Sequence, residues 1–300
     1  MGELLGTALE LGLISSVTVL SLFLSYYMLG VCDLSTDGCF TFGATVGAAV
    51  ALTGHPYLAI LAAIAAGMVS GLVTALLQTV CGIDSLLSGI IVNTALYSVN
   101  IAVMGNSSIL NLNREETVFT KAKALLDGTV FAGYYKIAVA IIAVAIIVVF
   151  LSLFLKTRVG LAIRATGNNP AMVRSSSINP IYTTIIGLVI SGGITALSGS
   201  LLAFSQKSVN IDIGSGMVTV ALASLLIGNT FTAKGNITVR AIGAVAGAFI
   251  FRLVYTVALT LNMPAFMLKL VSSVIVVIAI AVPYIKTKFP ILKRKLERRG

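Results

Sequence analysis

Two carboxylates, Asp33 and Asp37, lie on either side of Ser35 at the end of a long uncharged stretch. An ionised side chain is costly in an apolar environment, so it normally faces a water-filled cavity or a charged partner. The same residue types also cap helix N-termini in loops. We therefore predict that Asp33, Ser35 and Asp37 either line a solute path or cap the next helix. Acid–base catalysis also uses paired carboxylates, but no nucleophile or metal-ligand cluster accompanies these two.

A second polar set, Asn93, Tyr97 and Asn100, has the spacing i, i+4 and i+7 within an apolar stretch. This spacing places the three side chains on one face of a helix. Such a stripe either lines a hydrophilic path or supplies hydrogen bonds between helices, as polar side chains commonly do in membranes. The stripe as a whole favours a lining, so we add these residues to the candidate translocation path.

Basic residues form two clusters, and each directly follows an apolar run. The segment 156–174 carries four basic residues and no acid, and the segment 286–300 carries seven basic residues and one acid, so together they account for the net charge of +10. Nucleic-acid binding or a solvated face are the other common explanations of basic clusters. Their position after apolar runs fits the positive-inside rule better. We predict that both clusters are cytoplasmic and that the chain binds no nucleic acid.

Motifs for catalysis and for ATP hydrolysis are absent from the sequence. It has no G-x-x-x-x-G-K-[ST] phosphate loop, no Ser-His-Asp set and no H-E-x-x-H. The three cysteines, Cys32, Cys39 and Cys81, lack zinc-site spacing. We predict a chain that is not an enzyme, with no catalytic residue, no metal and no cofactor of its own. The energy for any transport must then come from ATP bound by a partner or from an ion gradient.

The elements that position these residues are predicted from composition. Hydrophobic residues make up 58% of the 300 residues, charged residues only 10%, and the mean hydropathy is +1.05, whereas soluble domains have about 25% charged residues. This predicts an all-α transmembrane bundle of about 8–9 segments, each needing roughly 20 residues to cross. Two segments are short, which is typical of broken or re-entrant helices beside a solute path. The predicted segments are Leu4–Leu29, Cys39–Thr53, the stretch from Pro56 to Ile83, Ser85–Met104, Ile137–Leu155, Ile181–Phe204, Gly214–Asn229, Val239–Leu261 and Ala265–Ile285, of which Cys39–Thr53 and Gly214–Asn229 are the short ones.

Topology follows from the basic clusters. We predict one permease domain over residues 1–285, with a cytoplasmic loop at 156–180 and an external loop at 105–133, followed by a basic cytoplasmic tail at 286–300. Counting back from the tail places the N-terminus outside if all nine segments cross and inside if one is re-entrant, and we predict that it is outside. Arg252 lies in the middle of an apolar segment. A buried arginine needs an acidic or carbonyl partner, and Glu10 and Asp84 are the acidic candidates.

Three motifs carry a resemblance to a known family. The first runs from Thr157 to Pro170 as T-R-V-G-L-A-I-R-A-T-G-N-N-P, the second is Asp33-Leu34-Ser35 followed by Gly38, and the third runs from Ala223 to Thr230 as A-S-L-L-I-G-N-T. They resemble, in the same order, motifs of ABC-importer permeases of the branched-chain amino acid and ribose class. The segments Leu9–Leu13 and 33–38 further resemble a subgroup associated with aromatic amino-acid (tryptophan or tyrosine) uptake. The class usually has a small residue and Gly-Ile after the last arginine of the loop, where this chain has Ser175-Ser176-Ser177-Ile178.

The resemblance implies a permease subunit of an ATP-driven importer in the bacterial cytoplasmic membrane. Two copies would enclose the path, two cytoplasmic ATP-binding subunits would dock on the basic loops, and an extracytoplasmic solute-binding protein or lipoprotein would deliver the solute. The solute would be an amino acid, possibly an aromatic one. Independently of the resemblance, Asn169 and Pro170 are suited to the N-cap and first position of a short helix. The residues implied in coupling to the ATPase are Arg158, Gly160, Arg164, Ala165, Gly167, Asn168, Asn169, Pro170 and Arg174.

Three alternatives remain open at the level of sequence. The first is an importer of a sugar or a nucleoside with the same mechanism. The second is a secondary transporter driven by protons or sodium, in which Asp33, Asp37 or Glu10 forms the ion site. The third is a membrane scaffold or enzyme, and the missing catalytic set argues against it.

Overall fold

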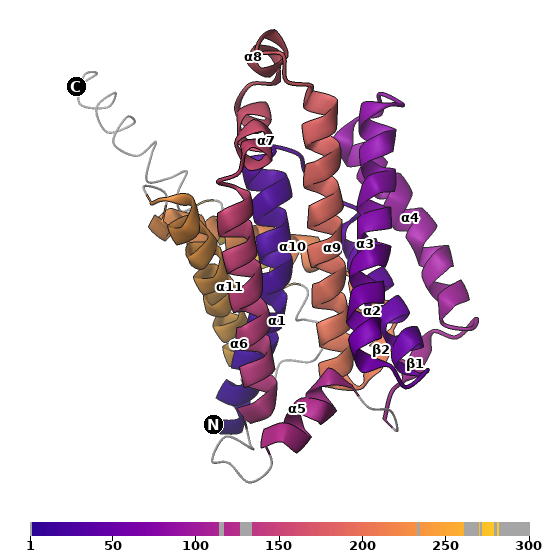
Figure 1. The fold of residues 1–300 in the computed structure, drawn as a ribbon. Coiled ribbons are helices and arrows are strands. Elements are labelled where there is room, and N and C mark those ends of the chain that lie inside the picture. Colours follow the sequence, from indigo (N-terminus) through magenta and orange to yellow (C-terminus); the bar gives the residue numbers. More distant parts are fainter. Residues whose placement is uncertain are drawn as a thin grey trace, which may run out of the picture.

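The computed structural model describes residues 2–113, 117–126, 134–232, 235–260, 270, 272–278 and 281. They form a bundle of helices with one short β-ribbon (Figure 1). The helices follow the apolar runs because a helix satisfies its own backbone hydrogen bonds, as lipid requires. The elements are α1 (Gly2–Leu22), the wider-turned η1 (Phe23–Met28), α2 (Thr36–Ala51), α3 (Pro56–Thr79), α4 (Ser85–Val103), β1 (Ile109–Asn111), α5 (Val118–Leu126), α6 (Tyr135–Phe154), α7 (Arg158–Asn168), α8 (Pro170–Ser175), α9 (Pro180–Gln206), β2 (Ser208–Asn210), α10 (Met217–Thr232) and α11 (Ile237–Thr260).

Six helices of the described residues are long and apolar enough to cross a membrane, namely α1 with η1, α3, α4, α6, α9 and α11. The polytopic helical bundle is therefore confirmed. The count of 8–9 segments is not reached by helices of full length, since α2 and α10 have only 16 residues each. Most of the ninth predicted segment, Ala265–Ile285, and the whole basic tail at 286–300 lie outside the described residues.

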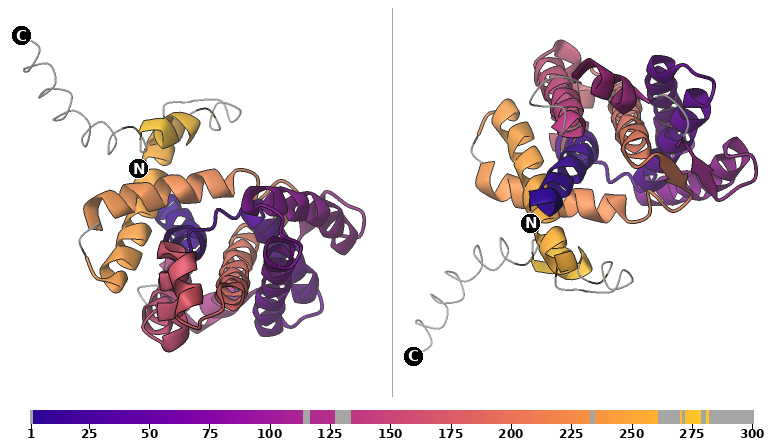
Figure 2. Two further views of the ribbon diagram at one scale, coloured as in Figure 1. Left: turned by 90° about the horizontal axis from the view of Figure 1, so that it is seen from above. Right: turned by 90° about the horizontal axis from the view of Figure 1, so that it is seen from below.

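Helix α9 is the centre of the bundle. It packs against α1, α2, α3 and α6, and Figure 2 places it between the α2–α4 group and the α1 and α6 group. Small residues permit this close packing, because a Cβ on Gly67 of α3 would overlap the carbonyl oxygen of Gly192. Serines replace apolar packing on the α1 side, where Ser198 Oγ donates to the carbonyl of Ile14 at 2.7 Å and Ser191 Oγ donates to that of Ser21 at 3.1 Å.

The two short helices, α2 and α10, begin beside each other in the interior. Helix α2 starts halfway along α9, because Cys39 Sγ lies 3.3 Å from the carbonyl oxygen of Gly192. Helix α10 starts at the same level, since the backbone N–H groups of Gly216 and Val218 donate to the carboxylate of Asp37 at 2.9 and 2.8 Å. The two predicted short segments are thus short helices whose N-termini meet inside the bundle.

The two ends of the molecule carry different structures. Helices α7 and α8 form one end, and the N-terminus, β1, β2 and α5 lie at the other (Figure 1). The ribbon pairs Ile109 with Asn210 and Asn111 with Ser208 in antiparallel register. The all-α prediction did not include this ribbon, because strands of three residues leave no pattern to detect. The structure places 156–180 opposite the described part of 105–133, whose residues 114–116 and 127–133 are outside the description.

Candidate solute path and coupling end

Helix α7 is fixed against the bundle by one buried face. Thr157 caps its N-terminus by accepting a hydrogen bond from the Gly160 N–H at 3.2 Å. Gly160, Ile163 and Thr166 recur about every three residues and are buried, as expected for one face of a helix. The hydroxyls of Thr166 and Thr183 lie 2.8 Å apart and join α7 to α9. The helix is therefore anchored along its length.

Two glycines of the predicted coupling set, Gly160 and Gly167, act as contact points within the chain. A Cβ on Gly160 would overlap the carbonyl oxygen of Phe154 at the end of α6, and a Cβ on Gly167 would overlap that of Met28 at the end of η1. Gly30 lies against Gly167 from the other side, with a positive φ of 74° that favours glycine. These glycines bring α7 into backbone contact with the segment that leads to α2.

Helix α8 projects from this end of the molecule (Figure 1). Asn169 caps it, because its side-chain oxygen accepts from the N–H groups of Ala171 and Met172, both at 3.1 Å, and Pro170 is its first residue. The predicted cap is confirmed. Val173 is the buried residue of the helix, whereas Met172 is 64% exposed. An exposed methionine on a capped helix offers an adaptable apolar contact to another protein.

The predicted coupling residues thus fall into two groups. Gly160 faces inward, Gly167 makes the backbone contact described above, and Arg164 and Ala165 are half-buried. The outward group is exposed and consists of Arg158, Asn168, Asn169, Pro170 and Arg174. After α8 the chain turns at Ser177, whose φ is 60°. This conformation favours glycine, which is the residue that the resembling class has before the isoleucine.

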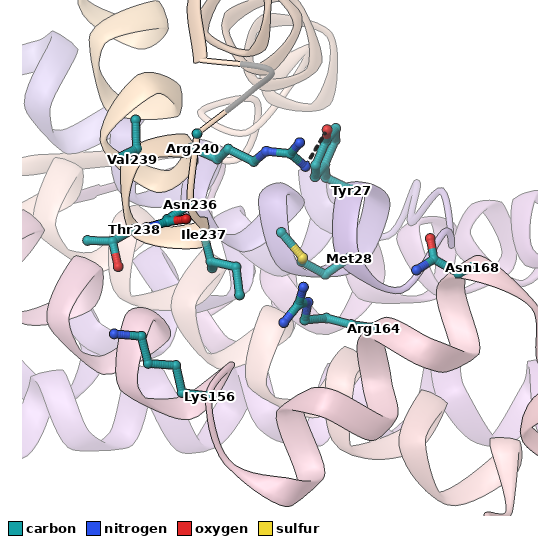
Figure 3. Close-up of a pocket in the computed structure, with 11 residues that line it drawn as sticks. Tyr27, Met28, Lys156, Arg164, Asn168, Asn236, Ile237, Thr238, Val239 and Arg240 are labelled. Carbon is teal, nitrogen blue, oxygen red and sulfur yellow. Dashed lines mark hydrogen bonds between the residues drawn. The ribbon is translucent and has the colours of Figure 1, made fainter. Parts of the chain in front are cut away.

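A cavity of about 630 Å³, which we call the basic cavity, lies between α7, the end of α6, η1 and the start of α11 (Figure 3). Arg240 from α11 donates through Nη1 to the hydroxyl of Tyr27 at 3.0 Å, and its guanidinium lies 5.4 Å from the centre of that ring. No sequence pattern indicates this cavity, because its walls come from distant parts of the chain. It is lined by Tyr27, Met28, Lys156, Arg164, Asn168, Gly235, Asn236, Ile237, Thr238, Val239 and Arg240.

A second cavity, of about 420 Å³, lies at the start of α2 and is here called the central cavity. Four of the six predicted path residues line it, namely Asp37, Asn93, Tyr97 and Asn100. Asn100 is buried and connects α4 to α2, since its amide donates to the carbonyl of Gly38 at 3.4 Å. Tyr97 is 52% exposed. The lining is completed by Gly38, Thr41, Thr94, Ser98, Ile211, Asp212 and Ser215.

Asp33 and Ser35 do not line the central cavity. Asp33 is buried, and its Oδ1 accepts from the backbone N–H of Ser35 at 2.8 Å and from the Ser35 hydroxyl at 2.6 Å. Ser35 in turn accepts from the hydroxyl of Thr74 at 3.1 Å. Both residues therefore shape the turn that precedes α2, and Ser35, at the N-cap position, makes no side-chain capping bond.

Asp37 both holds the start of a helix and lines the central cavity. Its carboxylate accepts the two backbone hydrogen bonds that begin α10, and the residue also lines the central cavity. Negative charge is favourable at a helix N-terminus. The sequence missed Asp212 and Ser215 in the same wall, because their approach to Asp37 depends on a contact between residues 179 positions apart.

Neither candidate partner of Arg252 binds it. Glu10 instead forms an ion pair with Lys136, at 3.4 Å from Nζ, and also bonds the hydroxyl of Ser205. Asp84 caps α4 by accepting from the N–H of Leu86 at 2.9 Å. The guanidinium of Arg252 lies 4.9 Å from the ring centre of Tyr255. A cation–π contact therefore replaces the expected ion pair. A third cavity, of about 340 Å³, is lined by Arg252, Tyr255, Ser215, Gly216, Met217, Thr219, Val220, Phe251, Ser272 and Ser273.

Comparison with known proteins identifies relatives over nearly the whole chain. A family model described as "Branched-chain amino acid transport system / permease component" matches residues 4–280. The tyrosine transport system permease protein of Clostridioides difficile is 34% identical over 270 residues, which cover 90% of this chain and 88% of that protein. The guanosine ABC transporter permease protein NupQ of Bacillus subtilis is 28% identical over 86% of this chain and 80% of that protein. A probable branched-chain amino acid transport permease, LivH of Methanocaldococcus jannaschii, is 27% identical over 71% of this chain and 60% of that protein. No solved structure matches the chain.

Proposed function

Because the chain belongs to the family of branched-chain amino acid transport system permease components, we propose that two copies of it form the membrane path of an ATP-driven amino-acid importer. The chain is a permease of the ABC type, a transport component rather than an enzyme. The observation that carries the rest of the proposal is α8, a short capped helix exposed at one end of an apolar bundle. Such a helix is suited to dock on an ATP-binding subunit in water, and an extracytoplasmic binding protein would deliver the solute at the opposite end.

A continuous set of contacts supports transmission from α8 to the central cavity. Helix α7 directly precedes α8 in the chain and touches the backbone of Met28 through Gly167. The chain then passes Gly30 and the turn at Asp33, and it enters α2 at Asp37, which holds the start of α10. Movement of α8 on ATP binding would therefore shift the wall of the central cavity. This is the kind of rigid-element displacement that alternating access uses.

The proposed orientation places residues 156–180 in the cytoplasm, because basic loops stay on that side. The N-terminus and the external loop at 105–133 are then proposed to be outside, which agrees with the place of the N-terminus and of the described part of the loop at the far end of the bundle. With α2 and α10 as partial crossings and a further segment towards the C-terminus, the proposed count is 8–9. The basic tail at 286–300 is proposed to be cytoplasmic, in the cytoplasmic membrane of a bacterium.

The central cavity supports an amino acid as the solute. Asp37 and Asp212 supply carboxylates that suit an ammonium group, and Asn93 and Asn100 supply amides that can donate to a carboxylate or a hydroxyl. Tyr97 adds a half-exposed ring that suits an aromatic side chain. We therefore propose an aromatic amino acid, in line with the tyrosine permease among the relatives. The guanosine permease among them makes a nucleoside the alternative.

The coupling proposal is tested by copurification of an ATP-binding subunit with the tagged chain. Met172→Glu places a charge on the exposed face of α8 and should remove most of that subunit from the purified complex. Ile109→Glu is the matched control, because Ile109 is 53% exposed at the opposite end, and it should copurify normally. Equal recovery of the ATPase with both variants would contradict the assignment of α8.

The solute proposal is tested by uptake in cells that express the complete transport system. Labelled tyrosine should accumulate and be displaced by tryptophan more strongly than by guanosine or ribose. Dissipating the proton and sodium gradients at constant ATP should leave uptake intact. Displacement by guanosine alone would replace the amino acid with a nucleoside, and loss of uptake with the ion gradient would overturn ATP-driven import.

A further inference from the structure

The basic cavity concentrates charge of one sign. Lys156, Arg164 and Arg240 line it, and no aspartate or glutamate is among the lining residues that the structure describes. The three side chains come from the end of α6, from α7 and from α11, and Figure 3 draws all three among the residues that line the cavity. Like charges brought together repel one another. An anion held between them would remove that repulsion.

Other donors in the wall suit the same ligand. The first turn of α11, from Ile237 to Arg240, lines the cavity, and the first N–H groups of a helix have no partner within the helix. Asn168, Asn236 and Thr238 add polar side chains. Three cations together with hydrogen-bond donors are the chemistry that binds phosphate oxygens.

The position of the cations along their helices indicates where the phosphate comes from. Lys156 directly follows the 20-residue apolar α6, and Arg240 lies one turn inside the apolar α11. Both therefore lie where a membrane-spanning helix meets the headgroup layer. Basic pockets between membrane helices at this depth bind the headgroups of anionic lipids.

The surfaces below the cavity suit the acyl chains of a lipid. Helices α6 and α11 are in contact, and each exposes large apolar side chains next to the cavity. On α6 these are Phe150, 43% exposed, and Leu153, 62% exposed; on α11 they are Val239, 46% exposed, and Ile242, 54% exposed. A headgroup in the cavity would thus have apolar surface directly beneath it.

We propose that the basic cavity binds the phosphate headgroup of an anionic phospholipid, whose acyl chains lie along α6 and α11. The bound phosphate bridges α7 to α11 and so holds the coupling end together. This site differs from the surface of α8, which projects beyond the cavity and carries no lining residue. Lipid binding is measured without ATP or solute, so its failure leaves the proposed transport function untouched. Only the assignment to the cytoplasmic leaflet rests on the proposed orientation.

The test is native mass spectrometry of the purified chain in detergent, with phosphatidylglycerol and phosphatidylcholine added at equal concentration. Wild type should retain phosphatidylglycerol preferentially. The double variant Lys156→Gln/Arg240→Gln should lose about 25-fold in phosphatidylglycerol affinity, because each basic side chain contributes roughly fivefold to attraction of an anionic lipid. The control Arg158→Gln/Arg174→Gln removes the same charge from the same end, at exposed residues outside the cavity, and should keep the preference.

Lys156→Glu tests the site with a variant that is expected to fold, because Lys156 is exposed and its replacement leaves the packing intact. This variant should elute and melt as wild type does, yet bind phosphatidylglycerol more weakly. Three results would overturn the proposal: no preference for the anionic lipid in wild type, equal loss in the control variant, or an unchanged preference in Lys156→Glu. Competition by inorganic phosphate at the same concentration would assign the cavity to small anions, and displacement of the lipid by an ATP-binding subunit would assign it to that protein. Either outcome would also overturn the lipid proposal.

Discussion

The central cavity and the basic cavity handle charge in opposite ways. In the central cavity the carboxylate of Asp37 is held by two backbone N–H groups of the same chain. In the basic cavity three cations share a wall in which the described lining residues include no acid. The first gathers acidic groups, because Asp212 adds a second carboxylate to the same wall. The second gathers positive charge among its described lining residues and, by the proposal above, suits an anion.

The largest effect on stability and uptake is expected at Asp37, whose carboxylate is hydrogen-bonded within the chain. Asp37→Ala leaves the N–H groups of Gly216 and Val218 without an acceptor, at a cost of about 1–3 kcal/mol for each, and also removes a wall of the central cavity. We expect a lower melting temperature and loss of uptake. Asp84→Ala is the matched control, because Asp84 caps α4 from an exposed position, and it should cost about 1 kcal/mol without loss of uptake. Normal uptake by Asp37→Ala would remove the central cavity from the path.

The next effect concerns the connection between the two cavities. Gly167→Ala puts a Cβ against the carbonyl of Met28, and overpacking of this kind costs typically about 1–3 kcal/mol. Helix α7 must shift, so we expect ATP hydrolysis to continue while solute uptake falls several-fold. Gly6→Ala should change neither rate, since nothing lies within 4 Å of a Cβ at that position. If Gly167→Ala remains fully coupled, the backbone contact does not transmit motion.

A smaller effect is expected from the polar stripe on α4. Asn100→Ala removes a buried amide that accepts from the Thr45 hydroxyl at 3.3 Å and donates to the carbonyl of Gly38. The loss should lower the free energy of unfolding by about 1–3 kcal/mol. Tyr97→Phe removes only a hydroxyl from a half-exposed ring, so we expect a smaller loss of stability than for the buried amide. Measured uptake should therefore show a larger rise in KM for Asn100→Ala than for Tyr97→Phe. The reverse order would mean that the ring hydroxyl, rather than the buried amide, contacts the solute.

The smallest effect is expected after α8. Ser177 has a φ of 60°, and a residue with a Cβ is less stable there than glycine by roughly 1–2 kcal/mol. Part of this is offset by the greater freedom of glycine in the unfolded chain. We expect Ser177→Gly to raise the melting temperature by a few degrees at most, with uptake unchanged. A lower melting temperature would show that the serine side chain stabilises the turn more than its backbone conformation destabilises it.

Local patterns predicted local structure well. The Asn169-Pro170 pair was sufficient for the cap of α8, because a cap depends on residues that are adjacent in sequence. The apolar runs predicted the helices for the same reason. The stripe on α4 predicted three residues that line one cavity, since helical spacing fixes which side chains share a face.

The errors concern contacts between distant residues. Sequence could not separate the role of Asp33 from that of Asp37. Asp33 bonds the neighbouring Ser35, whereas Asp37 bonds Gly216, which is distant in the sequence. The basic cavity was missed because Tyr27 and Arg240 are 213 residues apart. Arg252 was expected to pair with an acid, but an aromatic ring within the same helix stabilises it instead.

The length of α9 has a consequence for how the protein stands in its membrane. Its 27 residues extend about 40 Å at 1.5 Å per residue, whereas the hydrocarbon layer is about 30 Å thick. In its first turns Tyr182 is 69% exposed, and the Thr183 hydroxyl is hydrogen-bonded to Thr166 of α7. These turns therefore extend through the headgroup layer. This extra length keeps α8 clear of the lipid surface, so a bilayer that is thicker by several ångströms should bring its headgroups up to the proposed docking helix.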